Sequence, residues 1–222
     1  RHGILVLASM IVGFDYQDRE TIAKELRGLL RLRPALTQFL IYGPTPGTPF
    51  YDRVAKEGRL RQEVFADRND YYRKCTGFTA MVNHPKLSPG DIEQAKAWCF
   101  EEDYKKLGPS SFRSVRVWLN GYQHLRHSAS EAVRRKAAML ALEMRRAYPL
   151  FLAGRLFAPN LRVQRWIAAF ERRLHREVGR PTLWQRALSL VAVAAATWTK
   201  FSLKFDCFQH PRLPARRFRW SE

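Results

Sequence analysis

The chain has 222 residues, 46% of them apolar, and its fourteen Phe and six Trp exclude an intrinsically disordered protein. The net charge of +19 makes anionic partners the class to examine. Three cysteines, Cys75, Cys99 and Cys207, have neither the spacing of a disulfide framework nor that of a zinc or iron–sulfur site. We therefore expect reduced thiols.

The six histidines are scattered, and only His124 and His127 are close enough in sequence to share a helix face. No adjacent cysteine or carboxylate completes a metal site, so we expect no metal bound by this chain alone. The N-terminus shows no secretory signal of a charged segment, an apolar core and a cleavage site. We expect a cytoplasmic protein, with a peripheral position at a membrane as the alternative.

Residues 1–65 are predicted to alternate strands with helices. The expected elements are a strand over 3–12, a helix over 19–33, a strand over 36–42 and a helix over 50–57. The first strand is one continuous apolar run, which is typical of a parallel strand buried on both faces. The order strand, helix, strand, helix predicts parallel strands joined by right-handed crossovers.

Two unusual loops follow the two expected strands. The first, residues 12–15 (VGFD), contains a Gly that lets a ligand approach the backbone, where free peptide groups can hydrogen-bond an adenine edge. The second, residues 42–49, contains three prolines, which fix backbone angles and suit a rigid pocket wall. An ordinary structural turn is the alternative for either loop alone. In α/β barrels the chemistry lies at the C-terminal ends of strands, where both loops fall.

Taken together, these segments resemble the radical S-adenosylmethionine enzymes. The family's fifth-strand signature, Gly-x-Ile-x-Gly, is matched by Ile11 and Gly13, with Ser9 in place of the first Gly. Members that also carry a cobalamin-binding domain often read GFIVGFD there, close to residues 9–15. They often continue with a Pro-Gly-Thr-Pro loop, a Tyr, a short helix and Glu-Gly-Arg, which residues 46–59 reproduce. The resemblance covers about the first third of the chain.

The resemblance implies S-adenosylmethionine and a [4Fe-4S] cluster as cofactors, and it extends to cobalamin. The family holds its cluster with a Cys-x3-Cys-x2-Cys loop, which is absent from this sequence. The chain is therefore expected to be the C-terminal part of a TIM-type barrel, inactive alone, with the cluster and cobalamin bound by a missing N-terminal portion. The residues that the resemblance places at the adenosyl group are Ile11, Val12, Gly13, Asp15, Tyr42 and Pro44.

The rest of the chain is expected to be mostly helical. Residues 66–125 read as an aromatic linker, loop-rich over 70–87, and a helical connection, and residues 126–222 as a basic helical extension. Ser88, Pro89 and Asp91 predict a helix start with a capping box, and Ser128 with Glu131 predicts another. The expected helices run from 88 to about 107, over 128–148, over 161–178 and over 183–205.

The extension carries most of the positive charge. Residues 126–222 hold 20 Lys and Arg against 6 Asp and Glu, whereas residues 1–65 hold 10 against 7. This excess predicts an anionic neighbour, which is RNA, the headgroups of a membrane, or an acidic surface elsewhere in the parent protein. Ordinary solvated helix faces are the alternative.

One segment of the extension, residues 187–199, is uncharged over thirteen positions, fewer than the 20 or so apolar residues of a membrane span. A buried core helix is the first interpretation. Trp184, Trp198 and Lys200 on its flanks also fit a helix lying in a membrane interface, which would suit a lipid-type substrate. Residues 211–220 are expected to form a flexible basic tail.

Two functions remain open at this point. The first is the C-terminal portion of a cobalamin-dependent radical S-adenosylmethionine enzyme that performs radical chemistry such as methylation of an unreactive carbon. The alternative is a basic helical binding module for RNA or an anionic membrane surface, without catalytic activity. The absence of an RNP, KH or other recognised motif disfavours RNA.

Overall fold

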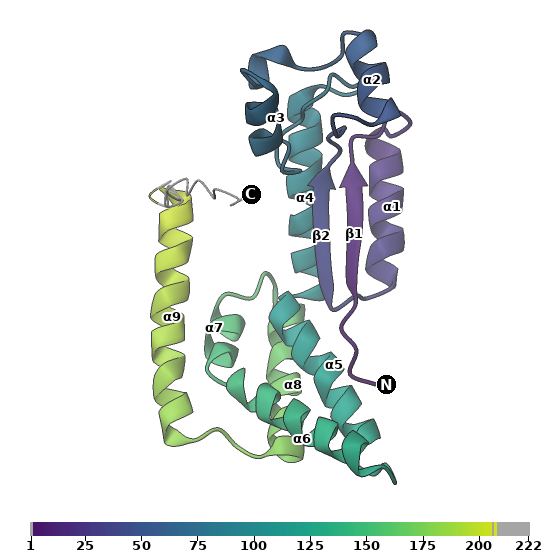
Figure 1. The fold of residues 1–222 in the computed structure, drawn as a ribbon. Coiled ribbons are helices and arrows are strands. Elements are labelled where there is room, and N and C mark those ends of the chain that lie inside the picture. Colours follow the sequence, from purple (N-terminus) through teal and green to yellow (C-terminus); the bar gives the residue numbers. More distant parts are fainter. Residues whose placement is uncertain (1, 206, 208–222) are drawn as a thin grey trace, which may run out of the picture.

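The computed structural model describes residues 2–205 and residue 207, and its fold is α/β and mostly helical (Figure 1). A strand–helix unit comes first, followed by a helical region. The first contains β1 (Leu7–Val12), α1 (Arg19–Arg31), β2 (Leu36–Ile41), α2 (Pro49–Lys56), the 3-10 turn η1 (Gln62–Val64), α3 (Arg68–Lys74) and α4 (Pro89–Leu107). The second contains α5 (Ser110–Leu125), α6 (Glu131–Arg146), α7 (Leu150–Leu156), α8 (Leu161–Val178) and α9 (Leu183–Lys204).

The two strands are parallel, as predicted, with Leu7 opposite Leu36 and Val12 opposite Ile41. Helices α1 and α4 cover one face of this sheet, where Val12 and Phe39 are fully buried. The other face is open, because Leu7 is 55% and Ile11 37% exposed. The prediction that the first strand is buried on both faces is therefore wrong, since no described helix covers the second face of β1.

The first strand also begins later than predicted, at Leu7 rather than at residue 3. Residues 2–6 run down to α5, where Gly3 packs on Gly121. A Cβ on Gly121 would lie 2.5 Å from the Cα of Gly3, so only glycine allows the two backbones to approach this closely. This contact draws the start of the chain away from β2.

A buried ion pair joins the two regions. Arg113 on α5 donates to both carboxylate oxygens of Asp103 on α4, at 2.8 and 2.9 Å, and to Thr37 Oγ1 on β2 at 3.3 Å. The side chains of Arg113 and Asp103 are only 2% and 8% exposed. The guanidinium therefore fixes the position of α5 relative to α4 and the sheet.

The four helices predicted after residue 66 are present as α4, α6, α8 and α9. Helix α8 has the predicted bounds, and α4 carries the predicted capping box between Ser88 and Asp91. Helices α5 and α7 were not predicted, and α3 overlaps a segment expected to be loop-rich. Helix α6 begins at Glu131 after Ser130, which makes no side-chain cap, so the predicted capping box at Ser128 is wrong. Ser128 Oγ instead accepts the N–H of Ser130 at 3.2 Å.

Helix α9 packs on α7, yet its large apolar side chains are exposed, so the prediction of a buried core helix is wrong. The core of the helical region is built from α5 to α8, around Phe112, Phe151 and Leu174. Within the part of the chain that the structure describes, no helix is long and apolar enough to cross a membrane. The predicted flexible tail at 211–220 lies outside the described residues.

Candidate functional site

The loops that follow β1 and β2 lie side by side at one edge of the sheet, next to the segment 80–87. Val12 O accepts the N–H of Tyr42 at 2.7 Å, which joins the two loops directly. Gly13 has φ +102, a left-handed conformation that a side chain strains. Both predicted loops therefore meet where β1 and β2 end.

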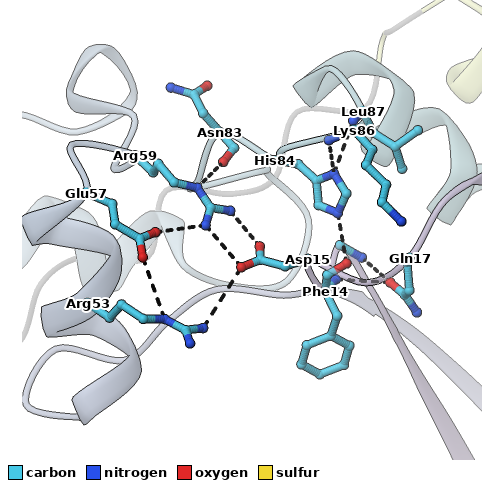
Figure 2. Close-up of polar contacts among 11 residues, drawn as sticks. Phe14, Asp15, Gln17, Arg53, Glu57, Arg59, Asn83, His84, Lys86 and Leu87 are labelled. Atoms are coloured by element: carbon cyan, nitrogen blue, oxygen red, sulfur yellow. Dashed lines mark hydrogen bonds and ion pairs between the residues drawn. The ribbon is translucent and has the colours of Figure 1, made fainter.

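The side chain of Gln17 forms hydrogen bonds with the backbone groups at the end of β1. Its Oε1 accepts the N–H groups of Gly13 at 2.7 Å and of Phe14 at 3.0 Å (Figure 2). Its Nε2 donates to Ile11 O at 3.1 Å. Gln17 is fully buried, and its Nε2 also donates to Glu25 at 2.7 Å. The prediction that these groups are free for an adenine edge is therefore wrong for Gly13 N–H and Ile11 C=O. No sequence motif marks this glutamine.

Asp15 does not point at open space but holds Arg59, which follows α2. The guanidinium donates to both Asp15 oxygens at 3.0 and 2.5 Å, and to Asn83 O at 2.9 Å (Figure 2). The hydrogen bonds from Arg59 lower the pKa of Asp15 despite its partial burial, and they raise the pKa of Arg59. Glu57 accepts a further bond from Arg59 at 3.0 Å. The Glu-Gly-Arg segment, residues 57–59, is therefore bonded to the loop that follows β1.

His84 contacts the same loop after β1, at the carbonyl group of Phe14. Its Nε2 lies 2.8 Å from Phe14 O, and its Nδ1 accepts the N–H groups of Lys86 and Leu87 at 3.0 and 3.1 Å (Figure 2). Because two backbone donors point at Nδ1, the proton of the neutral ring is on Nε2, which donates to Phe14 O. No sequence pattern predicts this role of His84, because its partner Phe14 lies 70 residues away along the chain.

Tyr42 and Pro44 form an apolar wall beside these polar contacts. The Tyr42 ring packs against Phe14 and Phe50, with centroids 4.6 and 4.8 Å apart, and burial raises the pKa of its hydroxyl. Pro44 is buried, and its carbonyl accepts the Tyr71 hydroxyl at 2.5 Å. Both residues are thus held by packing and hydrogen bonding within the protein, and their role as the wall of a ligand pocket stays a prediction.

Gly13, Asp15 and Tyr42 share one cavity with Arg59 and His84, but its volume is only about 10 Å³. That volume holds a single water at most. Ile11 is placed differently, because its side chain lies on the open face of the sheet. Val6 O and Val12 O bond to β2, so by the alternation of a parallel ladder the peptide groups of residue 11 face the free edge of β1. Only the Ile11 surface gives a ligand the size of an adenosyl group room beside the predicted residues.

A larger cavity, of about 560 Å³, lies near the opposite end of the strands, between α1, α4, α5 and α8. Its cationic lining consists of Arg27, Arg31, Arg33, Lys106, Arg116 and Arg162. The Arg116 guanidinium lies 5.5 Å from the Trp166 ring centroid. Burial and the charges of Arg33 and Arg113 lower the pKa of Arg116. Six cations with no acid in the lining make this a site that attracts anions.

The three cysteines are unpaired, and no group of three or more His, Cys, Asp and Glu side chains in residues 2–205 and 207 is arranged to hold a metal ion. Burial raises the pKa of Cys99 to about 12 and also raises that of Cys75, so neither thiol is a ready metal ligand. No family model matches the chain, and neither the curated proteins nor the solved structures contain a match.

Proposed function

We propose that this chain is the C-terminal part of a radical S-adenosylmethionine enzyme of the cobalamin-binding kind. One observation carries the proposal: the parallel strands β1 and β2 have helices on one face only. Neighbouring units of a (β/α) barrel have this arrangement, because helices cover the outside and the second face lines the interior. The free edge of β1 is where a preceding barrel strand would pair.

In this proposal the adenosyl group lies on the open face of the sheet, over Ile11. It would contact the Ile11 side chain there, in keeping with the role that the resemblance implies. Gln17 holds the backbone from Ile11 to Phe14 rigid, and the Asp15–Arg59 ion pair fixes the loop beyond it. These residues position the ligand and exclude water, which is the share of the chemistry that a protein contributes to a cofactor reaction.

The described residues do not offer ligands for a [4Fe-4S] cluster, so we place the cluster and cobalamin outside this chain. Radical chemistry such as methylation of an unreactive carbon then belongs to the whole parent protein. No acid, base or nucleophile is assigned in the chain, because the polar groups at the candidate site are engaged in structural contacts.

The test is binding of S-adenosylhomocysteine, the unreactive product analogue, to the 222-residue chain by titration calorimetry. We expect Ile11→Glu to weaken binding about tenfold or more, since a carboxylate on the open face opposes the adenine ring. The control is Leu7→Glu, the same change on the same face at the other end of β1, and it should bind as the parent does. No binding by the parent chain, or equal binding by both variants, contradicts the proposal.

The coding region upstream of Arg1 gives an independent test. A Cys-x3-Cys-x2-Cys run is expected about 100 to 150 residues before Arg1, the length that four strand–helix units occupy. A start codon next to Arg1 with no such run contradicts the proposal. That outcome favours the basic binding module, for which the cationic cavity at Arg116 and Arg162 would be the first site to examine.

A further inference from the structure

Helix α9 has one side against the protein and one side in water, and the two differ in side-chain size. Figure 1 shows α9 along one side of the molecule, beside α7. Its half-buried positions with helical spacing are Gln185, Leu188, Ser189, Ala192, Val193 and Ala196, and four of these six side chains are small or polar. Gln185 Nε2 donates to Arg145 O at 2.8 Å, which attaches the start of α9 to the end of α6.

The opposite side, here named the α9 outer face, is apolar. It consists of Leu183, Leu190, Val191, Trp198, Phe201 and Phe205, which fall on one side of the helix at 3.6 residues per turn. These six side chains are between 49% and 83% exposed. A row of large apolar side chains along a 22-residue helix is more than the scattered exposure of a soluble surface.

The charges around the outer face have a single sign. Residues 179–205 contain Arg180, Arg186, Lys200 and Lys204 and no Asp or Glu. By helical spacing, Arg186, Lys200 and Lys204 lie along one flank of the outer face, and all three are exposed. Two exposed tryptophans, Trp184 and Trp198, stand near the two ends of the apolar segment.

An anionic bilayer surface matches both features at once. Leu, Val and Phe side chains enter the boundary between headgroups and acyl chains, tryptophans favour that depth, and cations meet the lipid phosphates. A helix in this position lies in the plane of the membrane. Its length of about 33 Å, at 1.5 Å per residue, is then a contact along the surface.

We propose that α9 is an interfacial membrane-binding helix, which inserts its outer face into an anionic phospholipid leaflet and places Arg186, Lys200 and Lys204 among the phosphates. This inference does not rest on the proposed function, because it uses no residue of the strand ends.

The test is co-sedimentation of the 222-residue chain with vesicles. We expect binding to equimolar phosphatidylcholine and phosphatidylglycerol, weaker binding to phosphatidylcholine alone, and a blue shift of tryptophan emission on binding. Leu190→Ser combined with Trp198→Ser should reduce binding about tenfold or more, because both side chains enter the leaflet. The double variant should keep the circular dichroism of the parent, since neither side chain lies in the core.

The matched control is Met139→Ser combined with Leu142→Ser on α6, which removes two apolar side chains of similar exposure, 69% and 57%. This variant should bind vesicles as the parent does. Arg186→Gln, Lys200→Gln and Lys204→Gln together should remove the preference for anionic lipid.

Four outcomes overturn the proposal. The first three are no binding by the parent chain, binding that high salt abolishes, and equal losses of binding in the α9 and α6 variants. A fourth is a dimer in light scattering that the Leu190 and Trp198 substitutions dissociate, because a second copy of the chain would then cover the outer face.

Discussion

Helices α8 and α9 both pack on α7, yet they use their apolar residues in opposite ways. On α8, Val163, Ile167, Phe170 and Leu174 point into the core and are at most 5% exposed. On α9, large apolar side chains point into water. Apolar content therefore does not decide whether a helix is buried.

The difference follows from where each helix carries its charges. In α8, arginines such as Arg165, Arg172 and Arg176 lie between the apolar residues in sequence and occupy the outer side of the helix. Turning any other side of α8 toward the core would bury an arginine. In α9, residues 187–199 carry no charge, and the small Ser189, Ala192 and Ala196 allow the closest approach. Leu188 and Val193 are half-buried, and the other bulky apolar residues of α9 remain on the far side, where no described element lies.

The largest effect on stability is expected from a substitution on the buried side of α8. Leu174→Ala in α8 removes a fully buried side chain from the cluster around Phe151 and Ile167. We expect the free energy of unfolding to fall by about 2–5 kcal/mol, from lost transfer energy and the cavity that remains. Urea denaturation followed by circular dichroism measures it. A loss below about 1 kcal/mol would mean that α8 is no better packed than α9.

The N-cap residues of α8 and α9 are expected to differ in their effect on global stability. Asn160 caps α8 by accepting the N–H of Val163 at 2.9 Å, and Thr182 caps α9 by accepting the N–H of Gln185 at 3.2 Å. We expect Asn160→Ala to cost about 1 kcal/mol of global stability.

Thr182→Ala should instead fray the first turn of α9 without moving the global midpoint, because α9 buries few large side chains. Amide hydrogen exchange of residues 183–186, measured beside the urea midpoint, distinguishes the two cases. A global shift from Thr182→Ala as large as that from Asn160→Ala contradicts the distinction.

A smaller effect on stability depends on pH and comes from His175 on α8. Burial lowers the pKa of His175, Glu171 opposes this shift, and Arg180, Arg186 and Arg155 reinforce it. The unfolded chain therefore takes up a proton at higher pH than the fold does. The stabilisation is present above about pH 6.5 and is lost as pH falls below that value.

His175→Gln should flatten the dependence of stability on pH between about 7 and 5, with a difference below about 1 kcal/mol. Thermal unfolding across this range measures the slope in both proteins. An unchanged slope in the variant shows that His175 is not the group responsible.

The smallest effect is expected on the α9 outer face. Leu190→Ala removes a side chain that is 66% exposed, so stability in solution should change by less than about 0.5 kcal/mol. Urea denaturation under the conditions used for Leu174→Ala gives the direct contrast. A cost near that of Leu174→Ala would show that the outer face is covered in solution.

Local patterns predicted most of the elements. The parallel order of β1, α1 and β2 followed from apolar runs and Pro34, and α8 and the Ser88 cap of α4 followed from short-range spacing. These features depend on neighbours in sequence, which a single chain displays. For the same reason the predicted site residues lie at the ends of β1 and β2, and their role toward a ligand stays a prediction.

The features that escaped prediction depend on distant partners. Gln17 fills the end of β1 only because α1 turns back there, and His84 reaches Phe14 across about 70 residues. The exposure of α9 depends on how much surface the neighbouring helices offer for packing, and the apolar periodicity of α9 itself does not show this. Helix α5 was missed because Arg113, Arg116 and Gly121 blur its apolar stripe.

The Arg113–Asp103 pair has a mechanical consequence. Apolar surfaces tolerate sliding, but two hydrogen bonds from one guanidinium to one carboxylate set both a distance and a plane. The third bond, to Thr37, extends this constraint to β2. The three bonds thus hold α5 in one orientation to α4 and β2, so we expect the helical region to turn with the strands rather than to swing about Gly108 and Pro109, which join α4 to α5.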